Sequence, residues 1–136
     1  MRILAKVVIN NVYGGYALSD AAILWMAANG GLPLMIAEGY EPDNVNSGMY
    51  LFHAAAFRSL PLLVECVETL GEAASGDHER AMPTWEDNRT GASLSVYVWD
   101  AEYGVEYQIE ERYGLETVTH PWQPAKWLTS PIWEVK

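Results

Sequence analysis

The stretch that decides the fold reads ILAKVVINNVYGGYALS and covers residues 3–19. Its first part, from Ile3 to Val12, is rich in β-branched residues and is typical of a buried strand. Gly14 and Gly15 end that strand in a tight turn, because glycine adopts positive φ without steric cost. Ser19 is a good helix N-cap, so the stretch predicts a strand, a turn and a helix in that order.

Two helices are predicted along the chain. The first begins after Ser19 and runs to about Ala28, where residues 29–31, Asn-Gly-Gly, provide a C-cap. The second lies between Ser59, its expected N-cap, and Gly76, with Pro61 in the first turn, where the missing N–H of proline costs nothing. Its apolar residues recur on one face with glutamates outside, as in a helix that covers a core.

The other regular segments are predicted to be strands. Residues 49–57 are assigned to a strand, although three consecutive alanines favour a helix there, and residues 32–48 to a loop that can hold one short strand. Strands are also predicted over 94–99, 105–110 and 115–119, the last two joined by a hairpin turn at 112–114. In residues 105–110, apolar side chains alternate with polar ones, which indicates an acidic outer face.

The order of these elements predicts an α+β fold. A single mixed or antiparallel sheet of about four to five strands is expected to carry two helices on one face. Residues 1–136 should form one domain, because half of them are hydrophobic and the chain has the length of one core. A polar loop at 77–91 and a Trp/Pro-rich tail at 121–136 lie outside the regular elements.

The net charge of −10 is unevenly distributed. Residues 1–58 hold three basic and four acidic side chains, whereas residues 59–136 hold five basic and fourteen acidic ones. Direct binding of nucleic acid is therefore not expected, because phosphate needs Lys and Arg. A basic protein surface is the better partner, and the alternative is that the charge serves solubility alone.

The sequence predicts a protein of the cytoplasm. No run reaches the roughly 18 uninterrupted apolar residues of a membrane span, and the N-terminus lacks the apolar core of a signal peptide. Cys66 is the single cysteine, so an internal disulfide is impossible and a reducing compartment fits.

Three blocks of sequence resemble a widespread group of small bacteriophage proteins. Those proteins open with a strand ending in Ile-Asn, followed by Tyr-Gly-Gly-Phe-x-Leu-Ser and a helix. Here Ile9-Asn10 is followed by the run 13–19, YGGYALS, in which Tyr16 replaces the Phe. Residues 60–76 and 107–116 resemble the second helix and the acidic hairpin of that group, with Leu60 in place of an Asp. The resemblance implies phage origin, and hence the cytoplasm of a host cell, but no activity.

No set of residues predicts catalysis. The three histidines lie in different segments without the spacing of metal ligands, so no metal site and no cofactor are expected. Cys66 sits in the middle of a predicted helix and should pack in the core. Neighbouring carboxylates such as Glu110 and Glu111 look exposed, whereas acid–base catalysis needs one carboxyl in an apolar pocket. We therefore expect no enzyme and no catalytic residue.

The glycine turn is a candidate ligand site. A strand, a glycine turn and a helix can receive a phosphate on backbone N–H groups, although the turn lacks a full phosphate-binding motif. The alternative is a tight turn without a ligand. If a ligand binds, Tyr13 and Tyr16 are expected to stack on a base. The candidate ligand-binding residues are Tyr13, Gly14, Gly15, Tyr16 and Ser19.

A second candidate site is an acidic surface with aromatic residues. Exposed aromatic side chains mark binding hot spots, and Tyr97 and Trp99 are expected on opposite faces of one strand, so that one is exposed. The candidate protein-interaction residues are Trp85, Glu102, Glu106, Glu110, Glu111 and Glu116.

Together these features predict a non-catalytic binding protein of a phage that interferes with a host process or an antiviral defence system. In the first mode, the acidic and aromatic surface docks on a basic host protein, as an inhibitor, an anti-CRISPR-like protein or a nucleic-acid mimic. In the second mode, a pocket near the Tyr13–Ser19 turn sequesters a small, cyclic nucleotide defence signal, and a homo-oligomer is then expected. An enzyme that degrades a nucleotide ranks third.

Overall fold

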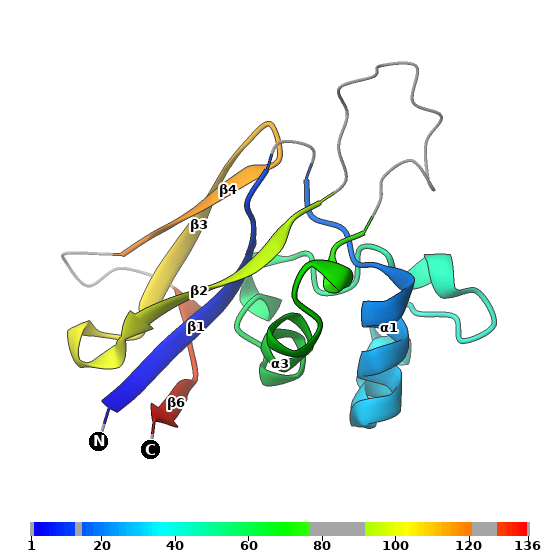
Figure 1. Cartoon of the computed structure of the whole chain (residues 1–136), viewed down its shortest axis with the longest axis horizontal. Helices are drawn as coiled ribbons and strands as arrows, with labels where there is room; N and C mark the ends of the chain where they lie inside the picture. Colours follow the sequence, from blue (N-terminus) through cyan, green and yellow to red (C-terminus); the bar gives the residue numbers. More distant parts are fainter. Residues whose placement is uncertain (1, 13–14, 77–91, 121–127, 136) are drawn as a thin grey trace.

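The computed structural model describes residues 2–12, 15–76, 92–120 and 128–135 (Figure 1). The predicted loop at 77–91 and the first part of the tail lie outside these residues. The α+β class is confirmed, but the strands form two three-stranded antiparallel sheets instead of one.

The central sheet is built around β1 (Arg2–Asn10). This strand pairs antiparallel with β2 (Leu94–Asp100) on one side and with β6 (Ile132–Val135) on the other. The end of the tail is therefore a strand instead of an irregular segment. The β-branched run that predicted β1 occupies the middle position, where a strand is covered on both faces.

The second sheet has the order β4-β3-β5, with β3 (Glu106–Arg112) between β4 (Leu115–Thr119) and β5 (Leu128–Thr129). The expected single sheet is wrong because the chain changes direction after β2. The carboxylate of Asp100 accepts the N–H of Glu102 at the start of a 3-10 turn. Gly104 then has φ +103°, a backbone conformation that favours glycine, and β3 leaves the plane of β2.

Helices cover one face of the central sheet. Ser19 caps α1 (Asp20–Met26) as predicted, and its hydroxyl accepts the N–H of Ala22. The second predicted helix is α3 (Pro61–Leu70), shorter than expected because Gly71 ends it with φ +58°. Its N-cap is Leu60, so the expectation that Ser59 caps it is wrong.

Two predictions for residues 32–57 are wrong. A short helix, α2 (Leu32–Ala37), stands where a loop was expected, because Met35 reaches the core one turn beyond the bend at Gly30. Residues 49–57 are turns and a 3-10 helix (Ala55–Phe57) instead of a strand. The alanines that favoured a helix there indicated the local conformation better than the aromatic residues did.

The domain has three layers, which are visible in Figure 1. Val8 of β1 faces the helices, whereas Val7 and Ile9 face the second sheet and contact Tyr107 of β3. β1 is thus buried on both faces.

Asp20–Ala37 is the one stretch of the described residues that is long and apolar enough to cross a membrane by length and composition. Core helices of soluble proteins meet the same test. Here Ile23, Met26 and Met35 are buried in the core, and the stretch bends at Gly30.

Candidate functional site

A buried ion pair joins the second sheet to the segment before α3. Arg58 donates two parallel hydrogen bonds to Glu116 of β4, with Nη1–Oε1 at 2.5 Å and Nη2–Oε2 at 2.7 Å. Arg58 is 1% exposed and Glu116 5%. The expectation that Glu116 lies on the acidic surface is wrong, because residues alternate along β4 and Glu116 points inward.

The remaining polar atoms of this pair are also satisfied. The N–H of Asn10 donates to Glu116 Oε1 at 2.7 Å. Arg58 also donates from Nη1 to the carbonyl of Val8 at 3.2 Å and from Nε to the carbonyl of His53 at 2.9 Å. A buried ion pair survives only with such partners, because removing two charges from water is costly. We call Arg58, Glu116 and Asn10 the ion-pair cluster.

Tyr16 extends the ion-pair cluster toward the surface. Its ring lies 4.1 Å from the Arg58 guanidinium, and its hydroxyl donates to the carbonyl of Leu51 at 2.6 Å. Burial raises the pKa of Tyr16 far above the usual tyrosine range. Because the side chain is only 2% exposed, the expectation that Tyr16 stacks on a nucleotide base is wrong.

The other residues of the predicted ligand turn have structural roles or lie outside the described residues. Gly15 has φ +95°, as the tight-turn alternative expects. The hydroxyl of Ser19 accepts the N–H of Ala22 as the cap of α1 and donates to the carbonyl of Ala73. Its donor and one acceptor position are therefore used within the fold. Tyr13 and Gly14 fall outside the described residues.

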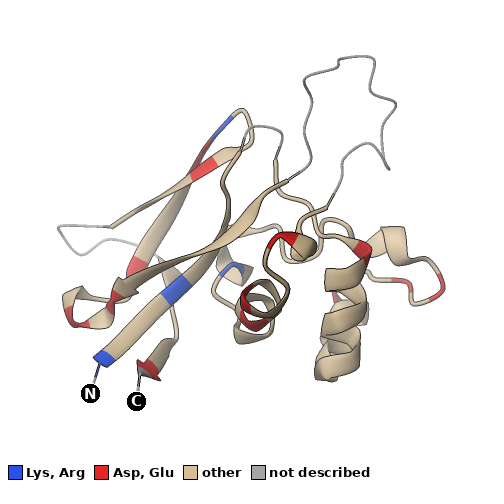
Figure 2. Cartoon of the chain, viewed as in Figure 1, with Lys and Arg blue, Asp and Glu red and all other residues tan. Residues whose placement is uncertain are grey.

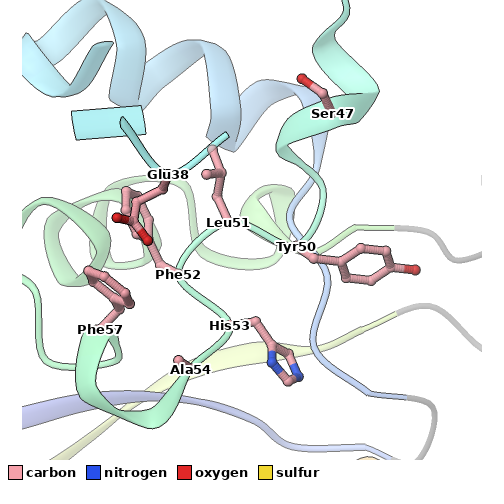
Figure 3. A pocket seen from close by; sticks show the side chains of 8 residues that line it. All are labelled: Glu38, Ser47, Tyr50, Leu51, Phe52, His53, Ala54 and Phe57. Carbon is pink, nitrogen blue, oxygen red and sulfur yellow. The ribbon is translucent and has the colours of Figure 1, made fainter. Parts of the chain in front are cut away.

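A pocket opens next to this network, with a volume of about 300 Å³, at the lower end of the range of small-molecule sites. Figure 3 shows the carboxylate of Glu38 on the same side as the rings of Phe52 and Phe57, while Tyr50 and His53 extend to the other side. Tyr50 and His53 are exposed. The lining residues are Glu38, Ser47, Tyr50, Leu51, Phe52, His53, Ala54 and Phe57. We call this the Glu38 pocket.

Two hydrogen bonds from the core hold the 51–53 segment of the Glu38 pocket wall. The carbonyls of Leu51 and His53 accept hydrogen bonds from Tyr16 and Arg58. Between them, Phe52 has φ +61°, a strained conformation for a bulky residue, which persists only where its surroundings determine it. Such outliers cluster at functional sites, which makes this pocket the strongest candidate site of the described residues.

The chemistry of the pocket is that of a cation site. Glu38 is the ionisable carboxylate of the lining, and no Lys or Arg belongs to the described lining residues. Two aromatic rings, those of Phe52 and Phe57, lie with centroids 5.4 Å apart at a tilt of 46°. Aromatic faces attract cations through their quadrupole, so the pocket favours a positive group over a phosphate.

The acidic surface on the second sheet is smaller than expected. Glu102 and Glu110 are exposed and Glu106 is half-buried, and Figure 2 shows red segments along β3 and in the turn before it. Glu111 is exposed but lies at the hairpin, where its carboxylate accepts the N–H of Gly114 at 3.0 Å. Trp85 lies outside the described residues.

Two tyrosines flank this surface, and the sequence reading did not single them out. Tyr103, before β3, is 89% exposed and Tyr113, after it, is 83% exposed. Both lie in turns, and a large aromatic residue in a turn is the signal that could have identified them. We call Glu102, Tyr103, Glu106, Glu110 and Tyr113 the β3 strip.

Tyr97 and Trp99 lie on the same face of β2, with ring centroids 5.7 Å apart, so the expectation of opposite faces is wrong. Residues two apart in a strand share a face. His120 joins them, since its ring lies 4.6 Å from that of Trp99, and its Nδ1 lies 3.0 Å from the carbonyl of Glu106. This aromatic cluster fixes the junction of the two sheets.

The candidate nucleophile is inaccessible. Cys66 is 0% exposed, and burial raises its pKa to about 12, so its thiolate is scarce at neutral pH. Among the described residues, no group of three or more His, Cys, Asp and Glu side chains could hold a metal ion. His78 lies outside the described residues. Both oxygens of the sheltered Glu116 carboxylate accept hydrogen bonds from Arg58.

The sequence reading also missed Arg58 and the pocket. Arg58 stands in the apolar run 54–60, AAAFRSL, and a lone cation in such a run is a signal of a buried ion pair. The parity of Glu116 with the half-buried Val118 could have indicated that Glu116 points inward.

In comparisons with known proteins, no family model, curated protein or solved structure matches the chain.

Proposed function

We propose that the chain is a non-catalytic binding protein of phage origin that acts in the host cytoplasm. It docks the β3 strip on a basic surface of a host protein and thereby interferes with a host process or an antiviral defence system. The observation that carries this proposal is the composition of the strip, which combines two almost fully exposed tyrosines with three glutamates. The phage origin rests on the resemblance of the opening strand, turn and helix.

The energetic argument distinguishes the two residue types. Tyrosines supply large contact area at low entropic cost and are enriched in binding hot spots. The glutamates mainly accelerate association with a basic partner and set its orientation. The basic residue Arg112 stands at the hairpin end of β3. The negative charge of the strip is therefore greatest toward its other end, at Glu102.

A matched pair of charge-reversal variants tests this proposal. Reversing Glu102, Glu106 and Glu110 to Lys raises the net charge of −10 by six. Reversing the exposed Glu65, Glu72 and Glu134 to Lys raises it equally, on other elements. The first variant should lose host proteins that the wild type retains at low salt, and the second should keep them. Equal loss in both variants would show that net charge, not the strip, governs binding.

The nucleotide-sequestering mode has weaker support. Its stacking residue Tyr16 is buried, and the neighbouring Glu38 pocket carries a carboxylate instead of a cation. Cyclic nucleotides that raise the melting temperature, in a protein that sediments as an oligomer, would favour this mode over docking. An unchanged melting temperature at millimolar nucleotide would remove it.

A further inference from the structure

The Glu38 pocket lies outside the β3 strip and has the composition of a cation site. It combines one carboxylate with the rings of Phe52 and Phe57 and holds no Lys or Arg in its described lining. A phosphate or carboxylate ligand would meet the Glu38 charge, which His53 alone among the basic side chains of the described lining could offset. A purely apolar ligand would leave that carboxylate partly desolvated and unpaired.

We infer that the Glu38 pocket receives an arginine side chain of the protein partner. This inference rests on the proposed docking function and names the anchor that the partner supplies. A guanidinium is planar, stacks on aromatic faces and takes a carboxylate through two parallel N–H donors. The pocket offers both elements in one lining, since Figure 3 shows Glu38 on the same side as Phe52 and Phe57. Of these two rings, Phe57 is the more accessible, because Phe52 is 3% exposed. Lysine, a compact and strongly hydrated charge, would use only the carboxylate well.

The pocket is ordered before the partner arrives. Hydrogen bonds from Tyr16 and Arg58 hold the carbonyls of Leu51 and His53, so the wall segment 51–53 cannot move without breaking them. Arg58 does not compete for Glu38, because both of its terminal nitrogens are bound to Glu116. A partner arginine would thus enter a preformed site, and less binding energy is lost in ordering it.

The probe for this inference is N-acetyl-arginine methylamide, which carries the guanidinium without free termini. Its uncharged isostere, N-acetyl-citrulline methylamide, is the matched control. Titration into the nitrogen-labelled full chain is followed by amide chemical shifts. We expect arginine to shift residues of the pocket lining at millimolar concentration. Citrulline should bind about tenfold more weakly, because it lacks the cation–π and ion-pair contributions.

Two variants locate the site. Glu38→Gln keeps the shape of an exposed side chain and should weaken the arginine probe about threefold, whereas Glu65→Gln on α3 should not. Phe57→Leu should weaken binding of the arginine probe about fivefold, because one aromatic face is lost. This comparison requires an amide spectrum that shows a folded variant. Equal binding of arginine and citrulline, or shifts confined to the β3 strip, would overturn the inference.

The same variants separate this inference from the proposed function. If Glu38→Gln retains the host protein as well as the wild type does, the pocket is not the anchor, while docking through the strip stands. If reversal of the strip abolishes retention and Glu38→Gln weakens it about threefold, both stand. If neither reversal of the strip nor Glu38→Gln changes retention of the host protein, both the docking proposal and the pocket inference are wrong.

Discussion

Replacing Glu116 by Leu tests whether the buried ion pair holds the second sheet to the rest of the domain. The substitution leaves Arg58, which is 1% exposed, without its counter-charge. Removing one member of a buried pair costs about 3–5 kcal/mol, because the other charge stays out of water. The N–H of Asn10 also loses its acceptor, which adds about 1 kcal/mol or more.

That loss is a large fraction of the total. A domain of this size is stable by about 5–15 kcal/mol, so the variant should remain folded with a melting temperature lower by about 10–20 °C. The six tryptophans report unfolding in urea, and the midpoint should fall while the slope stays constant. Glu110→Leu on the exposed side of β3 is the control, and should change stability by less than about 0.5 kcal/mol.

A double variant provides the refutation. In Arg58→Met with Glu116→Leu, no buried charge remains, and the cost should be smaller than that of Glu116→Leu alone. The carbonyls of Val8 and His53 then lack a donor, so the double variant should still be less stable than the wild type. If the two single costs simply add in the double variant, the residues are not energetically coupled and the reasoning fails.

Three further predictions concern groups buried elsewhere in the core. Cys66, with its pKa raised to about 12, should not react with a thiol reagent at pH 8 until urea unfolds the chain, and rapid reaction of the native protein would contradict its burial. Burial also raises the pKa of Tyr107, so the native state holds this proton longer than the unfolded chain. Stability from this group should be constant below about pH 10 and be lost as the pH rises beyond it. Tyr107→Phe should therefore reduce the fall of the urea midpoint in that range, and the contribution of the buried Tyr16 should remain. Gly76→Ala places a Cβ 2.5 Å from the carbonyl oxygen of Leu18, which is backbone and cannot rotate away. It should cost about 3 kcal/mol in thermal melts, whereas the exposed Thr69→Ala should cost almost nothing.

Local signals in the sequence predicted the elements better than their assembly. Ser19 capped its helix as expected, and the alternation around Tyr107 placed β3 half-buried with glutamates outside. The division into two sheets was missed because alternation reports which face of a strand is buried, not which strand it pairs with. The glycine at 104 and the acidic turn before it were the available indications of a break.

The candidate sites show the same limit. Glu116 was counted as surface charge, because carboxylates are rarely buried without a partner, and its partner Arg58 lies 58 residues earlier in the chain. No local pattern links the two. The Glu38 pocket depends on the same long-range contact, since its wall is positioned by the Arg58 side chain.

The ion-pair cluster connects the wall of the Glu38 pocket to the hairpin that carries most of the β3 strip. Glu116 belongs to the hairpin that carries the strip, and Arg58 binds both Glu116 and the carbonyl of His53 in the pocket wall. In the proposed docking, the two surfaces would therefore reach the partner with a spacing set by the fold, which lowers the ordering cost of the second contact. Exposed glutamates act at long range and govern the rate of association, whereas a side chain seated in a pocket governs the rate of dissociation. Changes in the strip should therefore be felt in salt-dependent association, and changes at Glu38 or Phe57 in the lifetime of the complex.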